Sequence, residues 1–265
     1  QPRVLRACRI ITEEGIADPI VIGPQQEITR QLADLGYAQD MVTIVDPIDF
    51  PQRDAYAENL FELRQRKGLT RDEARELLTH RHYLGPMMVR MGDADGLIGG
   101  LIHKYSDTVR PALQTIGLDA RARLAAGMYM MVFKSELMFF ADPVINIEPS
   151  AEDLAEIALC TAETARSFDV EPRVAMLSFS NFGSSRHPQA DKVRRATQII
   201  RQRAPDLEVE GEMQADLALT PAMLEEAYPF ADLSGRANVL IFPDLSSANV
   251  AYKLTQCLAG AEAVG

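Results

Sequence analysis

Short, uninterrupted apolar runs alternate with amphipathic helical patterns along this chain, and that alternation constrains its fold more than any other feature. Residues 173–178 and 238–242 have the length and continuous apolar character of strands buried on both faces of a parallel sheet. A helical pattern follows each run, over about 188–203 and 246–258. Strands separated by helices predict an α/β fold class with largely parallel sheets.

Capping signals and further apolar runs extend this pattern over the 265 residues. Thr70 with Glu73 predicts a helix from residue 70 to about residue 91, and Ser150 with Asp153 predicts another that reaches residue 168. Residues 207–209 predict a short strand, and residues 127–133 and 137–141 predict a strand pair. The length suits two α/β domains, 1–120 and 121–265, and the boundary is best placed within residues 118–123.

Composition excludes several classes of partner and location. The formal net charge is −11 and the sequence pI is about 4.9, which argues against nucleic acid as the main partner. No run reaches the roughly 18 apolar residues of a membrane span, and no signal peptide is visible, so we expect a cytoplasmic protein. Cys8, Cys160 and Cys257 lie far apart in helical apolar patterns, which predicts three small buried side chains and neither a disulfide nor a metal site.

The first candidate site is the segment 94–111. Residues 97–102 are apolar and broken by two glycines, which predicts a strand or a buried segment, and Pro111 predicts the first turn of a helix. Between them stand Ser106, Thr108 and Arg110. A guanidinium donates two parallel hydrogen bonds to a phosphate or carboxylate, so one interpretation is an anion site. The alternative is that Asp107 caps a helix and Arg110 pairs with a carboxylate; His103 is best interpreted as structural.

The second candidate is the loop that follows the 173–178 strand. Its polar residues stand where a strand leads into a helix, a place where α/β proteins bind anionic ligands. The spacing matches neither a P-loop nor a nucleophile elbow, and a capped turn is the alternative interpretation. We predict ligand contact from Ser180, Asn181, Gly183, Ser184, Ser185 and Arg186.

Two charged clusters complete the candidates. Glu210, Glu212 and Asp216 could hold a divalent metal or support acid–base chemistry, but without a nearby histidine we prefer a solvated helix start. Arg64 lies in the last turn of a predicted helix, where a basic residue complements the helix dipole. On pattern alone Arg64 would not be selected.

Several motifs, taken together and in this order, resemble the phosphate acetyl/butyryl transferase (phosphotransacetylase) family over essentially the whole chain. They include Glu14-Gly-Ile-Ala-Asp18, Glu62-Leu-Arg64, Asp107-Thr-Val-Arg110-Pro111, Met176-Leu-Ser-Phe-Ser180, Gly211-Glu-Met-Gln214-Ala-Asp216 and Ala237-Asn-Val-Leu-Ile-Phe-Pro243. The resemblance implies two α/β domains with a cleft between them, a dimer or larger homo-oligomer, and acetyl transfer between coenzyme A and phosphate. It implies that Arg64 and Arg110 hold phosphate or acetyl phosphate, with Ser106 and Thr108 beside them, and that Glu212 and Asp216 lie in the cleft.

The resemblance also carries two departures. Family members have an opening strand before this start, and they continue past this end into a segment that contacts the coenzyme A thiol and supplies the base. We therefore expect an incomplete first domain, and the catalytic residues stay unassigned. Asn181-Phe182 stands where ordinary members carry Thr-Lys, and this variant resembles the C-terminal phosphotransacetylase-like domain of hybrid malic enzymes.

That second resemblance sets the order of three hypotheses. The first is a regulatory domain that binds acetyl-CoA and controls an NADP-dependent malic enzyme, which decarboxylates malate to pyruvate, with NADP and a divalent metal bound outside this chain. The second is an active phosphate acetyltransferase. The third is a module that chiefly drives oligomerisation. In each case we expect no metal in this chain.

Overall fold

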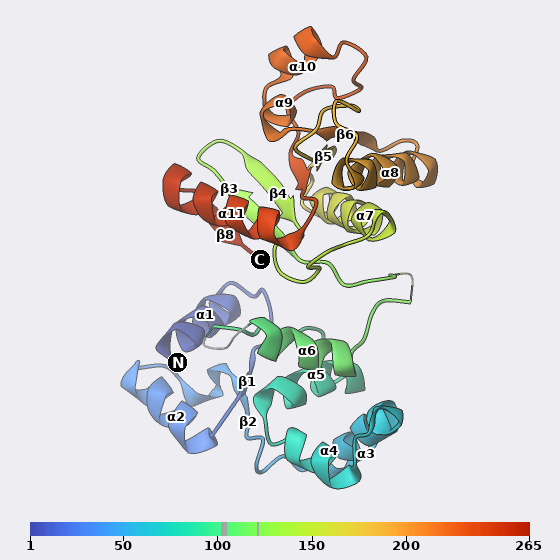
Figure 1. Ribbon diagram of the computed structural model, residues 1–265. Coiled ribbons are helices and arrows are strands. Elements are labelled where there is room, and N and C mark those ends of the chain that lie inside the picture. Colours follow the sequence, from blue (N-terminus) through green and yellow to red (C-terminus); the bar gives the residue numbers. More distant parts are fainter. Residues whose placement is uncertain (102–104, 121) are drawn as a thin grey trace. The chain divides into compact units, whose positions relative to one another are not determined.

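The chain forms two compact units, Gln1–Gly117 and Leu118–Gly265 (Figure 1). The structure is a computed structural model that describes residues 1–101, 105–120 and 122–265, and of Ser106 the backbone alone. Within these residues, none of the helices combines the length and the apolar character that a membrane span requires.

Unit 1 is built around a small parallel sheet of two strands, in which Val21 lies opposite Ile44. Helices surround the sheet and supply two apolar clusters, one around Leu5 and Leu32 and the other around Leu60, Leu84 and Met87. The elements are α1 (Pro2–Glu13), β1 (Ile20–Ile22), α2 (Gln25–Asp34), η1 (Gln39–Met41), β2 (Thr43–Val45), α3 (Arg53–Arg64), η2 (Gln65–Lys67), α4 (Arg71–Leu77), α5 (Arg81–Met91) and α6 (Tyr105–Thr115).

Unit 2 contains a six-stranded sheet with the order β6-β5-β7-β4-β3-β8. The four strands from β6 to β4 are parallel to one another, whereas β3 is antiparallel to β4 and β8 is antiparallel to β3. The elements are β3 (Met128–Val132), β4 (Leu137–Ala141), α7 (Ala151–Ser167), β5 (Arg173–Leu177), α8 (Pro188–Arg203), β6 (Glu208–Met213), α9 (Ala215–Leu219), α10 (Pro221–Ala227), β7 (Val239–Ile241), α11 (Leu245–Ala259) and β8 (Glu262–Val264).

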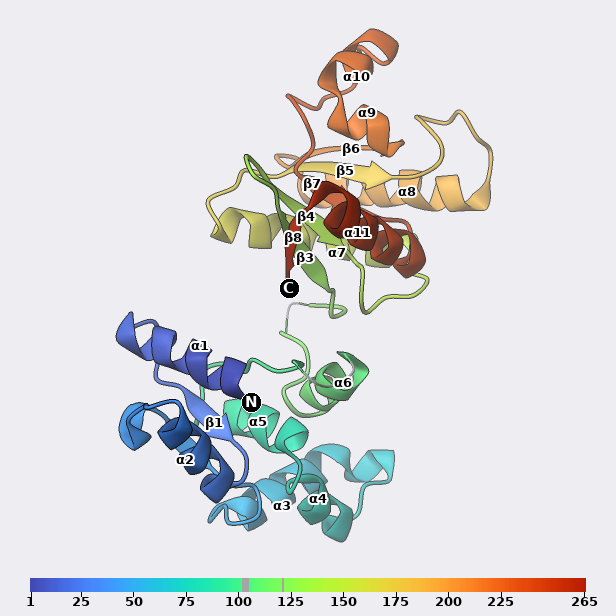
Figure 2. The same ribbon diagram turned by 90° about the vertical axis from the view of Figure 1, so that its left-hand side faces the viewer.

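Helices cover both faces of this sheet, which explains why its central strands are apolar without interruption (Figure 2). Successive strand residues point to opposite faces, so Val174 and Met176 pack with α7 and α8, whereas Ala175 and Leu177 pack with α9 and α11. The predicted α/β class with largely parallel sheets is confirmed. Among the described strands, the antiparallel pairings are those of β3 with β4 and of β3 with β8.

The helix predicted over residues 70–91 is in fact two helices. The capping box of Thr70 and Glu73 begins α4 as expected, but α4 ends at Leu77 and α5 begins at Arg81. At the junction the Thr79 hydroxyl donates to the carbonyl of Glu76, and His80 is extended. A threonine that bonds to the preceding turn competes with the helix for backbone groups, which accounts for the break.

Two predictions for the 94–111 segment are wrong. Residues 97–101 form neither a strand nor a buried segment, and Ile98 is 93% exposed. Pro111 lies well inside α6, not in its first turn, because α6 already begins at Tyr105. Arg110 therefore projects from the body of a helix.

The cysteines also differ from the prediction. Cys8 is buried, Cys160 is partly buried and Cys257 is exposed on α11, so only Cys8 matches the small buried side chain that was expected. The apolar pattern around Cys257 includes Leu254 and Leu258, which are exposed as well. Periodicity identified a helix there but could not tell which of its faces is covered.

Candidate functional site

Arg64 and Arg110 are guanidiniums of unit 1 without an ion-pair partner among the described residues. Arg64 is the last residue of α3 and is half-buried, and Arg110 lies in α6 and is exposed. Arginines on a folded surface commonly pair with carboxylates, and this acidic chain offers many. The interpretation in which Arg110 pairs with a nearby carboxylate finds no such pair within the part of the chain that the structure describes.

Contacts through α5 fix the two helices that carry these arginines. The Arg90 guanidinium donates to Asn59 Oδ1 of α3 and to the carbonyl of Thr115 in α6, at 3.1 Å each. The Tyr83 hydroxyl of α5 donates to Gln114 Oε1 of α6 at 2.7 Å. Arg90 and Tyr83 thus tie both arginine-bearing helices to one rigid element, and neither contact occupies Arg64 or Arg110.

The hydroxyl of Thr108 is a second available group on α6. Its Oγ1 is buried and has no hydrogen-bond partner among the residues described. The side chain packs against two glycines: a Cβ added at Gly99 would lie 3.1 Å from Thr108 Cγ2, and one added at Gly100 would lie 3.8 Å from Oγ1. The two glycines have no side chain that could contact this hydroxyl, which is shielded from solvent and unpaired among the described residues. The side chain of Ser106, and all of His103, lie outside the described residues.

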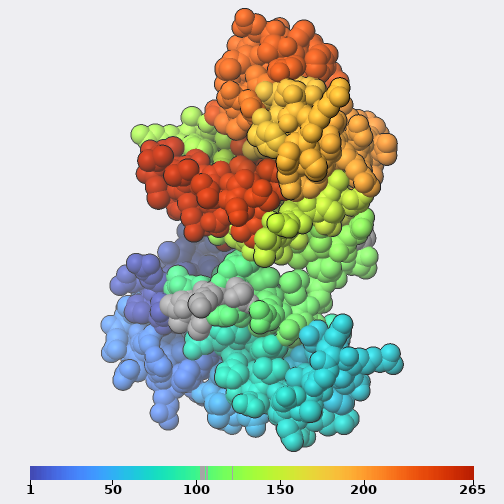
Figure 3. All heavy atoms as spheres, viewed as in Figure 1, coloured from blue at the N-terminus to red at the C-terminus, as the bar shows by residue number. Residues whose placement is uncertain are grey.

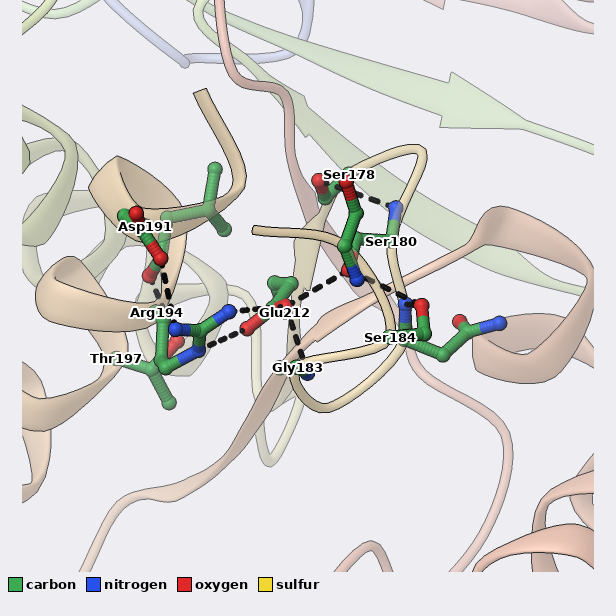
Figure 4. A network of polar contacts seen from close by, with 12 residues as sticks. Ser178, Ser180, Gly183, Ser184, Asp191, Arg194, Thr197 and Glu212 are labelled. Atoms are coloured by element: carbon green, nitrogen blue, oxygen red, sulfur yellow. Dashed lines mark hydrogen bonds and ion pairs between the residues drawn. The ribbon is translucent and has the colours of Figure 1, made fainter. Parts of the chain in front are cut away.

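The loop after β5 folds around the carboxylate of Glu212 (Figure 4). The Ser180 hydroxyl and the Gly183 amide each donate to Glu212 Oε1 at 2.9 Å. From the other side, Arg194 of α8 donates through Nε to Oε2 and through Nη2 to Oε1, at 3.0 Å each. Glu212 is fully buried, so these four donors satisfy a charge that has no access to water.

A second set of hydrogen bonds closes the loop on itself. Ser185 N donates to Ser180 Oγ at 3.1 Å, Asn181 N donates to Ser184 Oγ at 3.0 Å, and the two serine hydroxyls are 3.2 Å apart. Asn181 and Gln214 exchange two hydrogen bonds, of 2.7 and 3.2 Å. The loop therefore uses Ser180, Gly183 and Ser184 for its own geometry. Ligand contact from this loop stays a prediction.

The residues of the loop that face outward are of a different kind. Phe179 is 56% exposed and contacts His187, whose Nδ1 accepts from Gln189 N at the start of α8. Arg186 is exposed and has no hydrogen-bond or ion-pair partner within the described part of the chain. In the space-filling view the loop, in golden yellow, forms part of the surface of unit 2 (Figure 3).

Of the acidic cluster, only Asp216 lies at a solvated helix start. Glu210 and Glu212 lie on β6 and are buried, and each pairs with an arginine of α8, Arg201 and Arg194 respectively. Asp216 is exposed in the first turn of α9, where its Oδ1 accepts from Leu217 N. The predicted pair of cleft carboxylates thus consists of one enclosed group and one open group.

The environment of Glu212 determines its charge. Burial by itself raises the pKa of this carboxyl, but the hydrogen bonds from Arg194, from the Gly183 amide and from Ser180 outweigh it and lower the pKa below its usual range. Glu212 is therefore ionised at neutral pH and accepts hydrogen bonds only. Sequence reasoning missed Arg194; its signal was the seven-residue spacing from Arg201, which places both arginines on one face of α8.

Residues 1–101, 105–120 and 122–265 contain no group of three or more histidine, cysteine, aspartate or glutamate side chains that could hold a metal ion. Two of the three acidic residues of β6, Glu210 and Glu212, form ion pairs with arginines. In unit 1, the guanidiniums of Arg64 and Arg110 are groups suited to binding an anion.

Comparison with known proteins adds an independent line of evidence. The whole chain, residues 1–265, matches the family described as phosphate acetyl/butaryl transferase. Phosphate acetyltransferases from Thermoanaerobacterium thermosaccharolyticum and Bacillus subtilis are 42% and 40% identical to it, over 100% and 99% of this chain and 82% and 81% of their own lengths. A crystal structure of a phosphotransacetylase from Streptococcus pyogenes matches with a TM-score of 0.94 at 42% identity, over 100% of this chain and 81% of that one.

Proposed function

This chain belongs to the phosphate acetyl/butaryl transferase family, and from that premise we propose that it catalyses the reversible transfer of an acetyl group between coenzyme A and phosphate. The three relatives described above are acetyltransferases by name. The regulatory domain of a hybrid malic enzyme, which the loop variant suggested, has no support from these comparisons. The acyltransferase, which ranked second on sequence alone, is now the better supported function.

The observation that carries the proposal is the match of the whole chain to the acyltransferase family, and within its described residues unit 1 leaves donors unpaired at the two arginines that the family resemblance selects. Arg64 and Arg110 have no ion-pair partner, and Thr108 Oγ1 has no hydrogen-bond partner, in the described part of the structure. A phosphate bears up to two negative charges and accepts several hydrogen bonds, so two guanidiniums and a hydroxyl match its chemistry. We assign the phosphate or acetyl phosphate to these three residues.

The reaction makes specific demands on these donors. A phosphate oxygen attacks the thioester carbonyl carbon, a C–O bond forms as the C–S bond breaks, and coenzyme A leaves as a thiolate that takes up the proton released by phosphate. Guanidiniums that hold the phosphate also stabilise the negative charge that develops on the acyl oxygen during the attack. Acetyl-CoA is assigned to the outward residues of the 178–187 loop, where Arg186 offers a positive charge to its phosphates.

The test is an assay of the full-length protein with acetyl-CoA and inorganic phosphate. The proposal predicts that acetyl phosphate and free coenzyme A thiol form in equal amounts, and that supplying acetyl phosphate and coenzyme A reverses the reaction. Binding of acetyl-CoA without any acetyl phosphate would refute the proposal and return the regulatory domain to first place.

A further inference from the structure

Glu212 lies where the 178–187 loop, strand β6 and helix α8 meet (Figure 4). Its carboxylate accepts from Ser180 and Gly183 of the loop, and its backbone carbonyl accepts from Phe182 N at 2.8 Å. Three loop residues within a span of four are thus held by one residue. Glu212, which lies outside the loop in the sequence, therefore stabilises the conformation of the loop.

The ionised carboxylate also sets the direction of the hydrogen bonds inside the loop. A carboxylate only accepts, so the Ser180 hydroxyl proton points to Glu212. Ser180 Oγ is then left as an acceptor, and it receives Ser185 N and, necessarily, the hydroxyl proton of Ser184. Ser184 Oγ accepts in turn from Asn181 N. One charge therefore orders a chain of donors that runs through the loop.

Because of Arg194, replacing one carboxylate oxygen of Glu212 by an amide nitrogen would disturb the hydrogen bonds around it. Arg194 donates to both oxygens of Glu212, so both must be acceptors. A glutamine at position 212 has one oxygen and one amide nitrogen. With its oxygen in the place of Oε1 it still accepts from the loop and from Arg194 Nη2, but its amide then opposes Arg194 Nε, donor against donor. With its oxygen in the place of Oε2 it accepts from Arg194 Nε, but its amide then opposes the Gly183 amide and donates towards Ser180, which reverses the order of the chain.

Glu210 provides an internal comparison. It lies two residues before Glu212 on β6, is buried to a similar degree and pairs with Arg201 of α8. Its remaining contacts are with the amides of Gly211 and Asp232, away from the 178–187 loop. Burial and pairing with an arginine are common to both carboxylates. Contact with the loop distinguishes Glu212.

We propose that Glu212 is a positioning residue, which acts through Ser180 and Gly183 to hold the 178–187 loop in the conformation that binds acetyl-CoA. This inference rests on the proposed function, because it takes acetyl-CoA as the ligand of the loop. Glu212 is too enclosed to meet the ligand itself. Its effect is on the outward residues of the loop, Phe179 and Arg186.

The test compares Glu212→Gln with Glu210→Gln in the full-length protein. Acetyl-CoA and phosphate are varied separately, and rates are corrected for the folded fraction. Glu212→Gln is expected to raise the KM for acetyl-CoA about tenfold or more, and to leave the KM for phosphate within about twofold of wild type. Glu210→Gln is expected to lower stability and to leave both KM values within about twofold. Equal effects of the two variants on the KM for acetyl-CoA would overturn the inference.

Ser180→Ala keeps the test decisive if Glu212→Gln does not fold. It removes one hydroxyl and leaves the buried ion pair intact, and it is expected to raise the KM for acetyl-CoA in the same direction. An unchanged KM would contradict the inference. Calorimetric titration with acetyl-CoA separates the two proposals: absence of turnover in the wild type refutes the proposed function, whereas equal affinities of wild type and Glu212→Gln refute the positioning role.

Discussion

The carboxylate of Glu212 and the guanidinium of Arg194 form a two-point ion pair, in which Nε and Nη2 each lie 3.0 Å from a carboxylate oxygen. The pair joins β6 to α8, and the same carboxylate holds Ser180 and Gly183. The glutamate is fully buried and the arginine is partly exposed, so Arg194 neutralises the negative charge of Glu212 from the solvent side of the pair. Glu212 therefore couples the packing of β6 against α8 to the geometry of the 178–187 loop.

Stability should depend on the protonation of this carboxyl. The folded-state pKa of Glu212 is lowered, so its contribution is fully present above the unfolded value of about 4.3 and is lost as pH falls through the folded pKa. The difference in unfolding free energy between wild type and Glu212→Gln is therefore expected to be constant above about pH 5 and to shrink at lower pH. Urea unfolding of both proteins between pH 3 and pH 7 measures this. A difference that grows on acidification would show that the pKa is raised.

Thr108→Val should separate binding from stability. The variant removes a buried hydroxyl that has no partner among the described residues, so the unfolding free energy is expected to stay unchanged or to rise by up to about 1 kcal/mol. The KM for phosphate is expected to rise about tenfold, because a hydrogen bond to a charged ligand is lost.

Thr115→Val is the matched control on the same helix. Its hydroxyl is buried and donates to the carbonyl of Pro111 at 2.8 Å, so its removal is expected to lower the unfolding free energy by about 1 kcal/mol. Denaturant curves and phosphate titrations of both variants supply the comparison. Loss of stability in Thr108→Val with an unchanged KM would mean that the hydroxyl serves the fold.

Gly211→Ala should be among the most damaging small changes in unit 2. A Cβ at this position would lie 2.6 Å from the carbonyl oxygen of Met176 and 2.8 Å from its Cβ, and φ is +144°. Backbone strain and the clash with β5 together are expected to lower the unfolding free energy by about 2 to 5 kcal/mol.

Gly235→Ala provides the control for that change. The nearest atom to its added Cβ is Arg173 Nε, at 3.7 Å, so the unfolding free energy should stay within about 1 kcal/mol of wild type. Thermal or urea unfolding of the two variants tests the difference. Equal stabilities would show that β5 and β6 can separate enough to accept a side chain between them.

The parts of the fold that sequence predicted well are those determined by local pattern. The β5 run, the Ser150 capping box and the helix from Pro188 each depend on neighbouring residues, and each lies close to its predicted bounds. Residues 97–101 failed because apolar character shows what a segment prefers but not whether another element covers it. Pro111 was likewise predicted in the first turn of a helix, because the local pattern did not indicate that α6 begins at Tyr105.

The candidate site shows the same limit more sharply. The carboxylates of Glu210, Glu212 and Asp216 suggested a solvated helix start, because the arginines that neutralise the two glutamates lie in an earlier helix, outside the local pattern. The serines of the 178–187 loop were correctly placed after a strand, but their partner, Glu212, lies 32 residues beyond Ser180. Arg64 carries no local signal at all, and only the family resemblance selected it. Long-range pairing of charges is the information that local pattern lacks.

The central claim is that a phosphate anion binds at Arg64 and Arg110 and accepts the acetyl group. The most direct measurement is the phosphate dependence of acetyl phosphate formation from acetyl-CoA by wild type, Arg110→Gln and the exposed neighbour control Arg66→Gln. We predict turnover by the wild type, a loss in kcat/KM for phosphate of about 100-fold or more in Arg110→Gln, and a change of no more than about threefold in Arg66→Gln. Absence of turnover in the wild type, or an Arg110→Gln variant that matches Arg66→Gln, would contradict the account.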